Sequence, residues 1–451
     1  MTRYKYPILF LITILLFFVV ICGLKCYSNV RVKPNINRSE IDIIINFLLP
    51  MRQNSLSSKV TVSTEIPNTP VSYKIKWLNS TTMILSLEQK GNPRGQMLTF
   101  QINDAPTAIP LLKKSVSGQV RPSVDLRLLS EADLGKVPSG GPVPIIFNTP
   151  VDPKSIKEFV TLPIPGQLKP IQFSLASKRY TDYSQWQYIP DKPFQNNRSY
   201  TITLNPGLQS MGKSVMKKKQ ELTFTTAIQP RVVRTNPGKN ANQVRLYPSI
   251  EIILNQEVSE ASVNVIDLLK KTNIVGFTEI KKNKIIFQPS YALLPGRSYT
   301  VTVSLKSKDQ EPLNNYKFSF STVDMENKLW VDVNLGNKHT VRVYRGDKII
   351  RHMLCSGGRP ETPTPKGYFY TQDRGHSFWS ARFGEGATYW VRLVGQVLVH
   401  SVPRDHNWKT KEEEHAKLGL PASHGCIRLD EQDAKWFFEN IPRGTLVIIH
   451  E

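Results

Sequence analysis

Residues 420–430 read "LPASHGCIRLD" and put Ser423, His424, Gly425 and Cys426 in four consecutive positions. One interpretation is a turn that happens to hold polar residues, and the other is a cysteine nucleophile with an imidazole close by. An ordinary cysteine thiol, with a pKa of about 8.5, is only slightly ionised at neutral pH. Acyl transfer by Cys426 would therefore require a histidine within hydrogen-bond reach and donors for the oxyanion.

Two histidines are candidates for the base that serves Cys426. His424 is two residues away, but an extended or turning chain can direct its ring away from the sulfur. His400 ends the apolar stretch "VLVH", where a buried imidazole is costly unless the ring has polar partners. We therefore expect His400 to be the base, with its ring oriented by the carbonyl or the hydroxyl group of Ser401.

Alternating strand patterns surround these residues from about residue 325 onward. "NKLWVDVNL" and "HTVRVYRGDKIIRHMLCSGG" alternate apolar and polar residues, with "RGD" as a hairpin turn between Val343 and Ile349. Further strands are predicted in "TPTPKGYFYTQ" (362–372), "ATYWVRLVGQVLVHSVP" (387–403) and "GTLVIIHE". "EQDAKWFFENIP" (431–442) predicts a short helix with Asp430 as its cap. We expect a mostly β domain with one short helix, in which Cys355 is a small buried strand residue.

The combination of "TPTPKG", "VLVHSVP" and "SHGCIRL" resembles the signature of the L,D-transpeptidase catalytic domain, the YkuD fold, over about residues 325–451. The resemblance implies a cysteine acyltransferase that acts on peptidoglycan. By this resemblance, Cys426 would be the nucleophile, His400 the general base and Ser401 the residue that orients the base. The amides of Gly425 and Cys426 would form the oxyanion hole. His424 would line the site, and Ser423 stands at the family's Ser/Thr position.

Two departures from the family pattern affect the substrate-binding side. The stretch 401–422 is longer than the usual spacer and carries "KTKEEEH" (409–415), which predicts a lid-like loop. Arg428 stands where several family members have asparagine. Arg428 could pair with a stem-peptide carboxylate, or it could hold the loop by bonding backbone carbonyls. Arg428 and Ser423 are therefore our candidate substrate-binding residues.

The implied reaction begins when Cys426 attacks the carbonyl between the third stem residue and D-Ala, which forms a thioester. An amine of a neighbouring stem then forms a 3→3 cross-link, whereas attack by water would give an L,D-carboxypeptidase. A catalytically inactive Ig-repeat protein that binds the wall is another alternative, and the intact set of site residues opposes it. We expect no cofactor and no metal, because the remaining histidines lack zinc-type spacing and are interpreted as surface or loop residues: His339, His352, His376, His406, His415 and His450.

The middle of the chain repeats itself with a period of about 100 residues, in short strands separated by turns, which predicts tandem β-sandwiches that resemble bacterial Ig-like domains. "NNRSYTITL" (196–204) matches "PGRSYTVTV" (295–303), and "LTFTTAI" (222–228) matches "FSFSTVD" (318–324). The expected fold is mainly β. Its order is a cytoplasmic N-terminus (1–6), a transmembrane helix (7–24), a linker with a degenerate Ig-like copy (25–115), two Ig-like domains (116–228 and 229–324) and the catalytic domain (325–451).

The segment "PILFLITILLFFVVICGL" (7–24) has no charged side chain. As a helix it would measure about 27 Å, close to the thickness of a bilayer's hydrocarbon core. The flanking residues offer no convincing cleavage site, which favours an uncleaved single-pass anchor over a signal peptide. We expect the anchor to lie in the cell membrane and the domains that follow to lie on the cell-wall side.

The chain carries 59 Lys plus Arg against 36 Asp plus Glu, a formal net charge of +23. Such a charge favours anionic partners. Peptidoglycan stem peptides and anionic wall polymers are the expected partners. Nucleic acid is not expected, because the basic residues are scattered and an apolar span precedes them.

Overall fold

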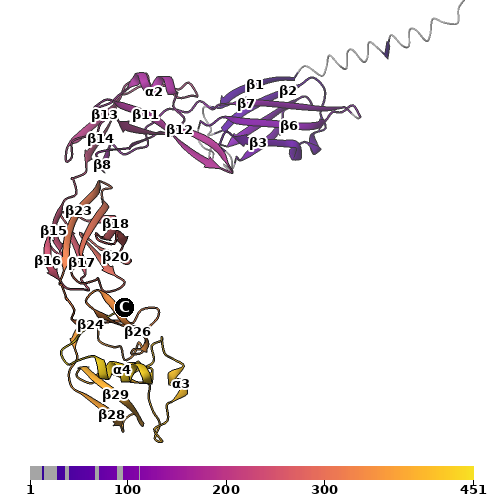
Figure 1. The fold of residues 1–451 in the computed structure, drawn as a ribbon. Coiled ribbons are helices and arrows are strands. Elements are labelled where there is room, and N and C mark those ends of the chain that lie inside the picture. Colours follow the sequence, from indigo (N-terminus) through magenta and orange to yellow (C-terminus); the bar gives the residue numbers. More distant parts are fainter. Residues whose placement is uncertain (1–12, 15–27, 36–39, 67–70, 89–94, 111) are drawn as a thin grey trace, which may run out of the picture. The chain divides into compact units, whose positions relative to one another are not determined.

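The computed structural model describes residues 13–14, 28–35, 40–66, 71–88, 95–110 and 112–451. Apart from residues 13 and 14, the predicted membrane anchor lies outside these described residues. Within them, no helix is both long enough and apolar enough to cross a bilayer. The chain divides into two compact units, residues 1–228 and 229–451, and each is described by itself. Among the described residues, strands dominate both units and the labelled helices are short (Figure 1).

The first part of unit 1 is a pair of sheets over one buried apolar cluster, which includes Ile43, Leu85 and Phe100. One sheet has the order β1 (Ser28–Asn35), β2 (Glu40–Phe47), β5 (Thr82–Glu88), β4 (Tyr73–Trp77), and the other β3 (Val60–Thr64), β6 (Leu98–Pro106), β7 (Lys113–Val120). Two 3-10 turns, Gln53–Ser55 and Ser57–Lys59, precede β3. Alternating burial along β6 fits a strand with one face on a core.

The second part of unit 1 also packs two sheets around one core, which includes Trp186, Tyr188 and Phe224. One sheet runs β10 (Val160–Thr161), β13 (Ser199–Leu204), β14 (Gln220–Thr226), β8 (Asp133–Val137), and the other β11 (Gly166–Leu175), β12 (Lys178–Pro190), β9 (Val143–Ile146). Helix α2 (Pro153–Phe159) was not predicted by the strand pattern. Asp152 caps this helix through the Lys154 and Ser155 amides, and Pro153 at its start favours a helical first turn.

The first sandwich of unit 2 surrounds a core that includes Ile252, Phe287 and Tyr299. Its sheets are β15 (Val232–Asn236), β17 (Ile250–Leu254), β21 (Lys284–Pro289), β20 (Gly276–Lys281), and β16 (Ala241–Val244), β23 (Pro312–Thr322), β22 (Ser298–Ser307), β18 (Val258–Asp267), β19 (Thr272–Asn273). In the preceding sandwich helix α2 follows β9, whereas in this one strand β18 follows β17.

The sequence repeat is also a repeat of strand register. Tyr200 pairs with Phe224 across β13 and β14, and Tyr299 pairs with Phe320 across β22 and β23. The rings of both pairs stack, with centroids 5.8 Å apart in the first pair and 5.6 Å apart in the second. Matched cross-strand aromatic pairs of this kind stabilise a sheet. The prediction that the two segments are copies of one sandwich is therefore confirmed at the level of register.

The C-terminal part of unit 2 is built on one nine-stranded sheet, with helices α3 (Glu412–His415) and α4 (Glu431–Asn440). The strand order is β27 (Gly367–Tyr370), β32 (Leu446–His450), β24 (Leu329–Asn334), β25 (Thr340–Arg345), β26 (Lys348–Ser356), β31 (Ile427–Leu429), β30 (Val397–Ser401), β29 (Glu385–Val394), β28 (Arg374–Ser380). Asp430 caps α4 as predicted, and buried Ala434 and Phe437 pack this helix on the core.

Candidate active site

Strand β31 brings Cys426 to the side of His400. Ile427 and Leu429 are completely buried, which fixes this short strand between β26 and β30. It runs parallel to β30, with His400 paired to Arg428, and antiparallel to β26. Cys426 is therefore held at the N-terminal end of a buried strand, beside the strand that carries the predicted base.

The turn before Cys426 is held by Ser423. The Ser423 hydroxyl accepts a hydrogen bond from the Gly425 amide (3.0 Å) and donates one to the Cys426 carbonyl (2.5 Å). Gly425 has a backbone φ of +119°, which residues other than glycine rarely adopt. Buried Ser423 thus acts within the turn, although substrate binding was one expectation for it. Because the Gly425 amide already has an acceptor here, its role in the oxyanion hole stays a prediction.

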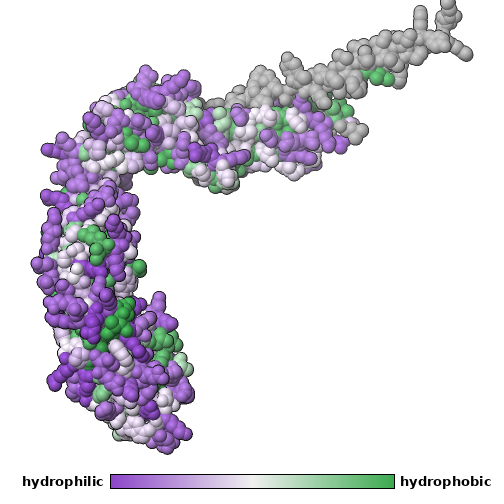
Figure 2. All heavy atoms as spheres, viewed as in Figure 1, coloured by the Kyte–Doolittle hydropathy of each residue, from purple (hydrophilic) through white to green (hydrophobic). Residues whose placement is uncertain are grey.

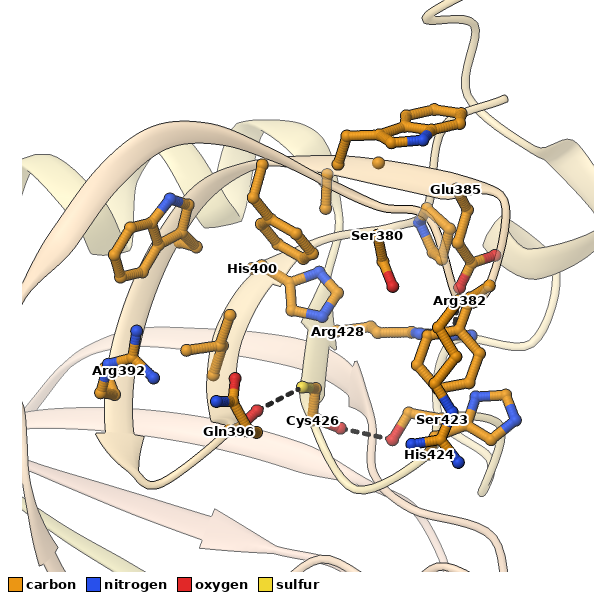
Figure 3. A pocket seen from close by; sticks show the side chains of 18 residues that line it. Ser380, Arg382, Glu385, Arg392, Gln396, His400, Ser423, His424, Cys426 and Arg428 are labelled. Atoms are coloured by element: carbon orange, nitrogen blue, oxygen red, sulfur yellow. Dashed lines mark hydrogen bonds and ion pairs between the residues drawn. The ribbon is translucent and has the colours of Figure 1, made fainter. Parts of the chain in front are cut away.

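The Cys426 thiol is half-buried and donates to the Gln396 carbonyl at 3.4 Å, as the dashed line in Figure 3 shows. Burial raises the pKa of this thiol, and a backbone hydrogen bond at Leu398 and the charge of Arg428 lower it by less. The Cys426 thiol is therefore neutral at neutral pH. Cys355, the other cysteine in the described part of the chain, is fully buried in β26 as predicted, and both cysteines are free.

His400 is buried with its ring fixed from one side. Its Nδ1 lies 2.6 Å from the Ser401 carbonyl oxygen. Because a carbonyl can only accept, Nδ1 carries the proton and Nε2 is left as the acceptor. Burial, helped by the charge of Arg428, lowers the pKa of His400 to about 4, and the bond to Ser401 opposes this shift. A neutral imidazole with a free Nε2 is the form that can accept a proton from a thiol.

The structure distinguishes the two ways in which Ser401 could orient the base. The carbonyl contacts His400, whereas the hydroxyl accepts from the Thr388 amide (2.9 Å) and donates to the Val402 carbonyl (3.0 Å). The Thr388 hydroxyl lies 3.0 Å from the Ser401 hydroxyl and 2.8 Å from a Glu431 carboxylate oxygen. Thr388 and Glu431 were not predicted as site residues, because nothing in their local sequence marks them as neighbours of Ser401.

Arg428 is 4% exposed and joins the long loop 401–422 to strand β29. Its guanidinium donates to Glu414 (2.5 Å) in α3, to Glu385 (3.2 Å) in β29 and to the Ala422 carbonyl (3.4 Å). Lys411 also pairs with Glu385. These contacts are of the kind expected if Arg428 holds the loop. Binding of a stem carboxylate by Arg428 would require it to give up one of them.

His424 lies in the site but does not face the thiol. Its ring stacks on Phe383, with centroids 4.5 Å apart and an interplanar angle of 17°. Figure 3 shows the His424 ring turned away from the Cys426 sulfur, whereas His400 lies above it. This arrangement agrees with the expectation that the fold, and not the adjacent residue, supplies the base.

Cys426 and His400 open into one cavity of about 550 Å³. Phe378, Trp379 and Trp390 give it aromatic walls, and Arg382 and Arg392 provide positive charge (Figure 3). A sulfur nucleophile, a neutral imidazole and a pocket of this size could carry out acyl transfer on a peptide-sized substrate.

Two of the remaining histidines are buried. His450 lies in strand β32, which corrects its interpretation as a surface or loop residue, whereas His339 lies in the loop before β25, which the prediction allowed. His450 is 1% exposed, and its Nε2 lies 2.7 Å from the Asp332 carboxylate on the adjacent strand. His339 is 4% exposed, and its Nδ1 accepts from the Gly357 amide at 3.0 Å. Each ring is tolerated in the core because it has a polar partner, which local sequence could not reveal.

Comparison with known proteins agrees with this geometry. Residues 328–449 match the L,D-transpeptidase catalytic domain (YkuD), and residues 130–226 and 227–322 each match the bacterial Ig-like domain. "Putative L,D-transpeptidase YciB" of Bacillus subtilis is 44% identical over 127 residues, which is 27% of this chain and 65% of that protein. "L,D-transpeptidase 1" of Mycobacterium tuberculosis is 33% identical over 119 residues, 24% of this chain and 44% of that protein.

The chain thus spans less than two thirds of the length of these relatives. A crystal structure of an L,D-transpeptidase from M. tuberculosis aligns with 49% of this chain and 98% of that one, at 20% identity and a TM-score of 0.24. The matched segments give the family assignment of each part of the chain. The C-terminal part of the chain is an L,D-transpeptidase catalytic domain of the YkuD family, and two bacterial Ig-like domains precede it.

Proposed function

We propose that the protein is a peptidoglycan L,D-transpeptidase that forms 3→3 cross-links through a thioester on Cys426. The observation that carries this proposal is the fixed tautomer of His400. Its Nδ1 is bound to the Ser401 carbonyl, and its ring shares the cavity with the only half-exposed thiol in the described residues.

The first half-reaction consumes one donor stem. The Cys426 sulfur attacks the carbonyl between the third stem residue and D-Ala while the thiol proton passes to Nε2 of His400. The tetrahedral intermediate then collapses, the C–N bond breaks, and the D-Ala amine leaves with the proton from His400. Because both groups are neutral at rest, this proton transfer takes place during the attack and not before it.

The second half-reaction regenerates the thiol. A side-chain amine of a neighbouring stem attacks the thioester carbonyl and gives its proton to His400. The C–S bond breaks, the Cys426 sulfur takes the proton back, and the new amide joins the third residues of two stems. Water in place of the amine would release a tripeptide, which is the L,D-carboxypeptidase alternative on the same residues.

We further propose that residues 7–24 anchor the protein in the cell membrane, with the later domains on the wall side. The support is the uncharged apolar run in the sequence. Fusions of a reporter that is active only outside the membrane would test it. Activity of a fusion after residue 451 supports the proposed orientation, and activity only of a fusion at residue 1 contradicts it.

The reaction is tested with the purified protein, its Cys426→Ala variant and a matched Cys355→Ala control. Each is incubated with disaccharide-tetrapeptide fragments of several stem types, and the products are read by mass spectrometry. A dimer lighter by one D-Ala, formed by the wild type and the control but not by Cys426→Ala, is expected. Tripeptide alone would identify a carboxypeptidase. Absence of any Cys426-dependent product from folded protein would favour the inactive wall-binding alternative.

A further inference from the structure

A second groove, of about 850 Å³, lies in unit 2 where the second Ig-like domain meets the catalytic domain. Its walls come from both domains: Arg245 follows β16, Arg345 ends β25, and Arg443 and Gly444 precede β32. No residue that lines this groove also lines the cavity around Cys426. Strands β27 and β32, which border it, are at one edge of the nine-stranded sheet, whereas β28, β29 and β30 form the other edge.

The two walls are held in a fixed relation by a shared core. Leu246 and Ala292 of the Ig-like domain pack with Trp330, Tyr344 and Ile448 of the catalytic domain in one buried cluster. At the groove itself, the Tyr368 hydroxyl accepts from the Tyr247 amide (3.0 Å) and donates to the Tyr247 carbonyl (2.7 Å). A groove built on such contacts exists before any ligand binds.

The charge of the groove has one sign. Four cations line it, Arg245, Lys328, Arg345 and Arg443, and no aspartate or glutamate does. Within the part of the chain that the structure describes, none of the four forms an ion pair. Asp347, two residues from Arg345, is bound instead to Arg297 at 2.6 Å. Four like charges that line one groove, with no acidic residue among them, favour an anion with several charges.

Aromatic rings complete the site. The Arg245 guanidinium lies 5.1 Å from the centre of the Tyr368 ring, which orients it over that ring. Tyr370 is 59% exposed beside it and also lines the groove. Three of the four cations are arginines, whose planar forks bind the two free oxygens of a phosphate diester in pairs.

We propose that this groove binds a linear wall polymer with repeated phosphate diesters, and that it holds the catalytic domain on the wall independently of the reaction at Cys426. Repeated single charges on a flexible backbone suit four cations spread along one groove, and the tyrosine rings offer faces for the carbon skeleton between phosphates. This site goes beyond the proposed transpeptidase activity, and its test does not depend on that activity.

The probe is a fluorescently labelled poly(glycerol phosphate) oligomer, whose binding to the full-length protein is followed by anisotropy. The test variant is Arg345→Gln/Arg443→Gln. Because hydrophilic side chains cover most of the face shown in Figure 2 and the whole chain is basic, a matched control must lose the same charge. Arg179→Gln/Arg198→Gln serves this purpose, since both arginines are exposed in the first Ig-like domain.

Loss of two charge-assisted contacts should weaken binding of the probe about tenfold or more, against less than about twofold for the control. Equal losses in the two variants would overturn the proposal, because binding would then follow net charge. In a second binding measurement, a poly-glutamate of equal length and charge replaces the phosphate polymer. If it binds as tightly and with the same dependence on Arg345 and Arg443, the phosphate assignment is overturned and the groove takes carboxylates. An unchanged thermal unfolding curve shows that the variant is folded.

Discussion

His400 and Arg428 are register partners across the parallel strands β30 and β31, so that a permanently charged guanidinium stands beside the proposed general base. The positive charge of Arg428 adds to burial in lowering the pKa of His400. The same guanidinium is bound to Glu414 of the long loop and to Glu385 of β29, which also pairs with Lys411 of the loop. One side chain thus links the protonation of the base to the position of the loop.

Replacement of Arg428 by methionine should destabilise the β30–β31 region by about 3 kcal/mol, because it leaves two partly buried carboxylates without their main partner. Glu414 and Glu385 keep Lys417 and Lys411 as partners, which limits the loss. Hydrogen exchange of the β30 and β31 amides measures this change. Lys417→Gln is the control: its side chain is 46% exposed, so its removal should cost less than about 1 kcal/mol. Similar costs for the two variants would contradict the anchoring role of Arg428.

The stability of the catalytic domain should fall as the pH is lowered from about 6.5 toward 4. The pKa of His400 is about 4 in the folded protein, below the ordinary value of 6.5. Between these values the unfolded chain binds a proton that the folded chain does not bind, so acid favours unfolding. The contribution of His400 is about 3 kcal/mol when the pH has reached 4.

The variant His400→Gln checks this sign, with the free energy of opening measured by hydrogen exchange at pH 7 and at pH 4.5. The variant should lose less stability than the wild type over this interval. Its dependence on pH should not vanish, because burial also lowers the pKa of His339. An equally steep fall in the variant would show that His400 is not a source of the effect.

The rate at which Cys426 is alkylated should show that the Cys426 thiol and the His400 imidazole are both neutral at rest. With the pKa of Cys426 raised by burial, iodoacetamide should label it slowly at pH 7 and faster as the pH rises. His400→Gln should change the rate at pH 7 by less than about threefold, because a neutral imidazole does not stabilise a thiolate. Peptide mapping reads Cys426 separately from buried Cys355, which should be labelled only when the domain unfolds. A large fall in the Cys426 rate on losing His400 would instead indicate a resting thiolate–imidazolium pair.

Ser401→Ala should leave kcat within about threefold of the wild type. The carbonyl that binds His400 belongs to the backbone and is retained, whereas the lost hydroxyl serves Thr388 and Val402. The variant should be less stable by about 1–3 kcal/mol, since the partly buried Thr388 amide loses its acceptor. A fall in kcat of about a hundredfold in folded protein, with KM unchanged, would show that the hydroxyl orients the base after all.

Much of the architecture could be predicted because it depends on local alternation. The hairpin at "RGD", the aromatic strand after "TPTPKG" and the helix capped by Asp430 are where the patterns placed them. The repeat was visible because cross-strand pairs such as Tyr200 with Phe224 need the same residues in each copy. Helix α2 was missed because Asp152-Pro153 converts a stretch that resembles a strand-to-strand bend into a helix start.

By itself the sequence determined the candidate nucleophile, the candidate base and the β-rich class, because chemical type and strand periodicity are properties of adjacent residues. Only the tertiary structure decided which groups surround them. Glu414 and Glu385 accept hydrogen bonds from Arg428. The Thr388 amide donates to Ser401, and His450 is hydrogen-bonded to Asp332. The His424 ring stacks on Phe383. These contacts join residues that are distant in sequence, so no local pattern predicts them. Those made by buried Arg428, Ser401 and His450 satisfy polar groups that burial would otherwise leave unpaired.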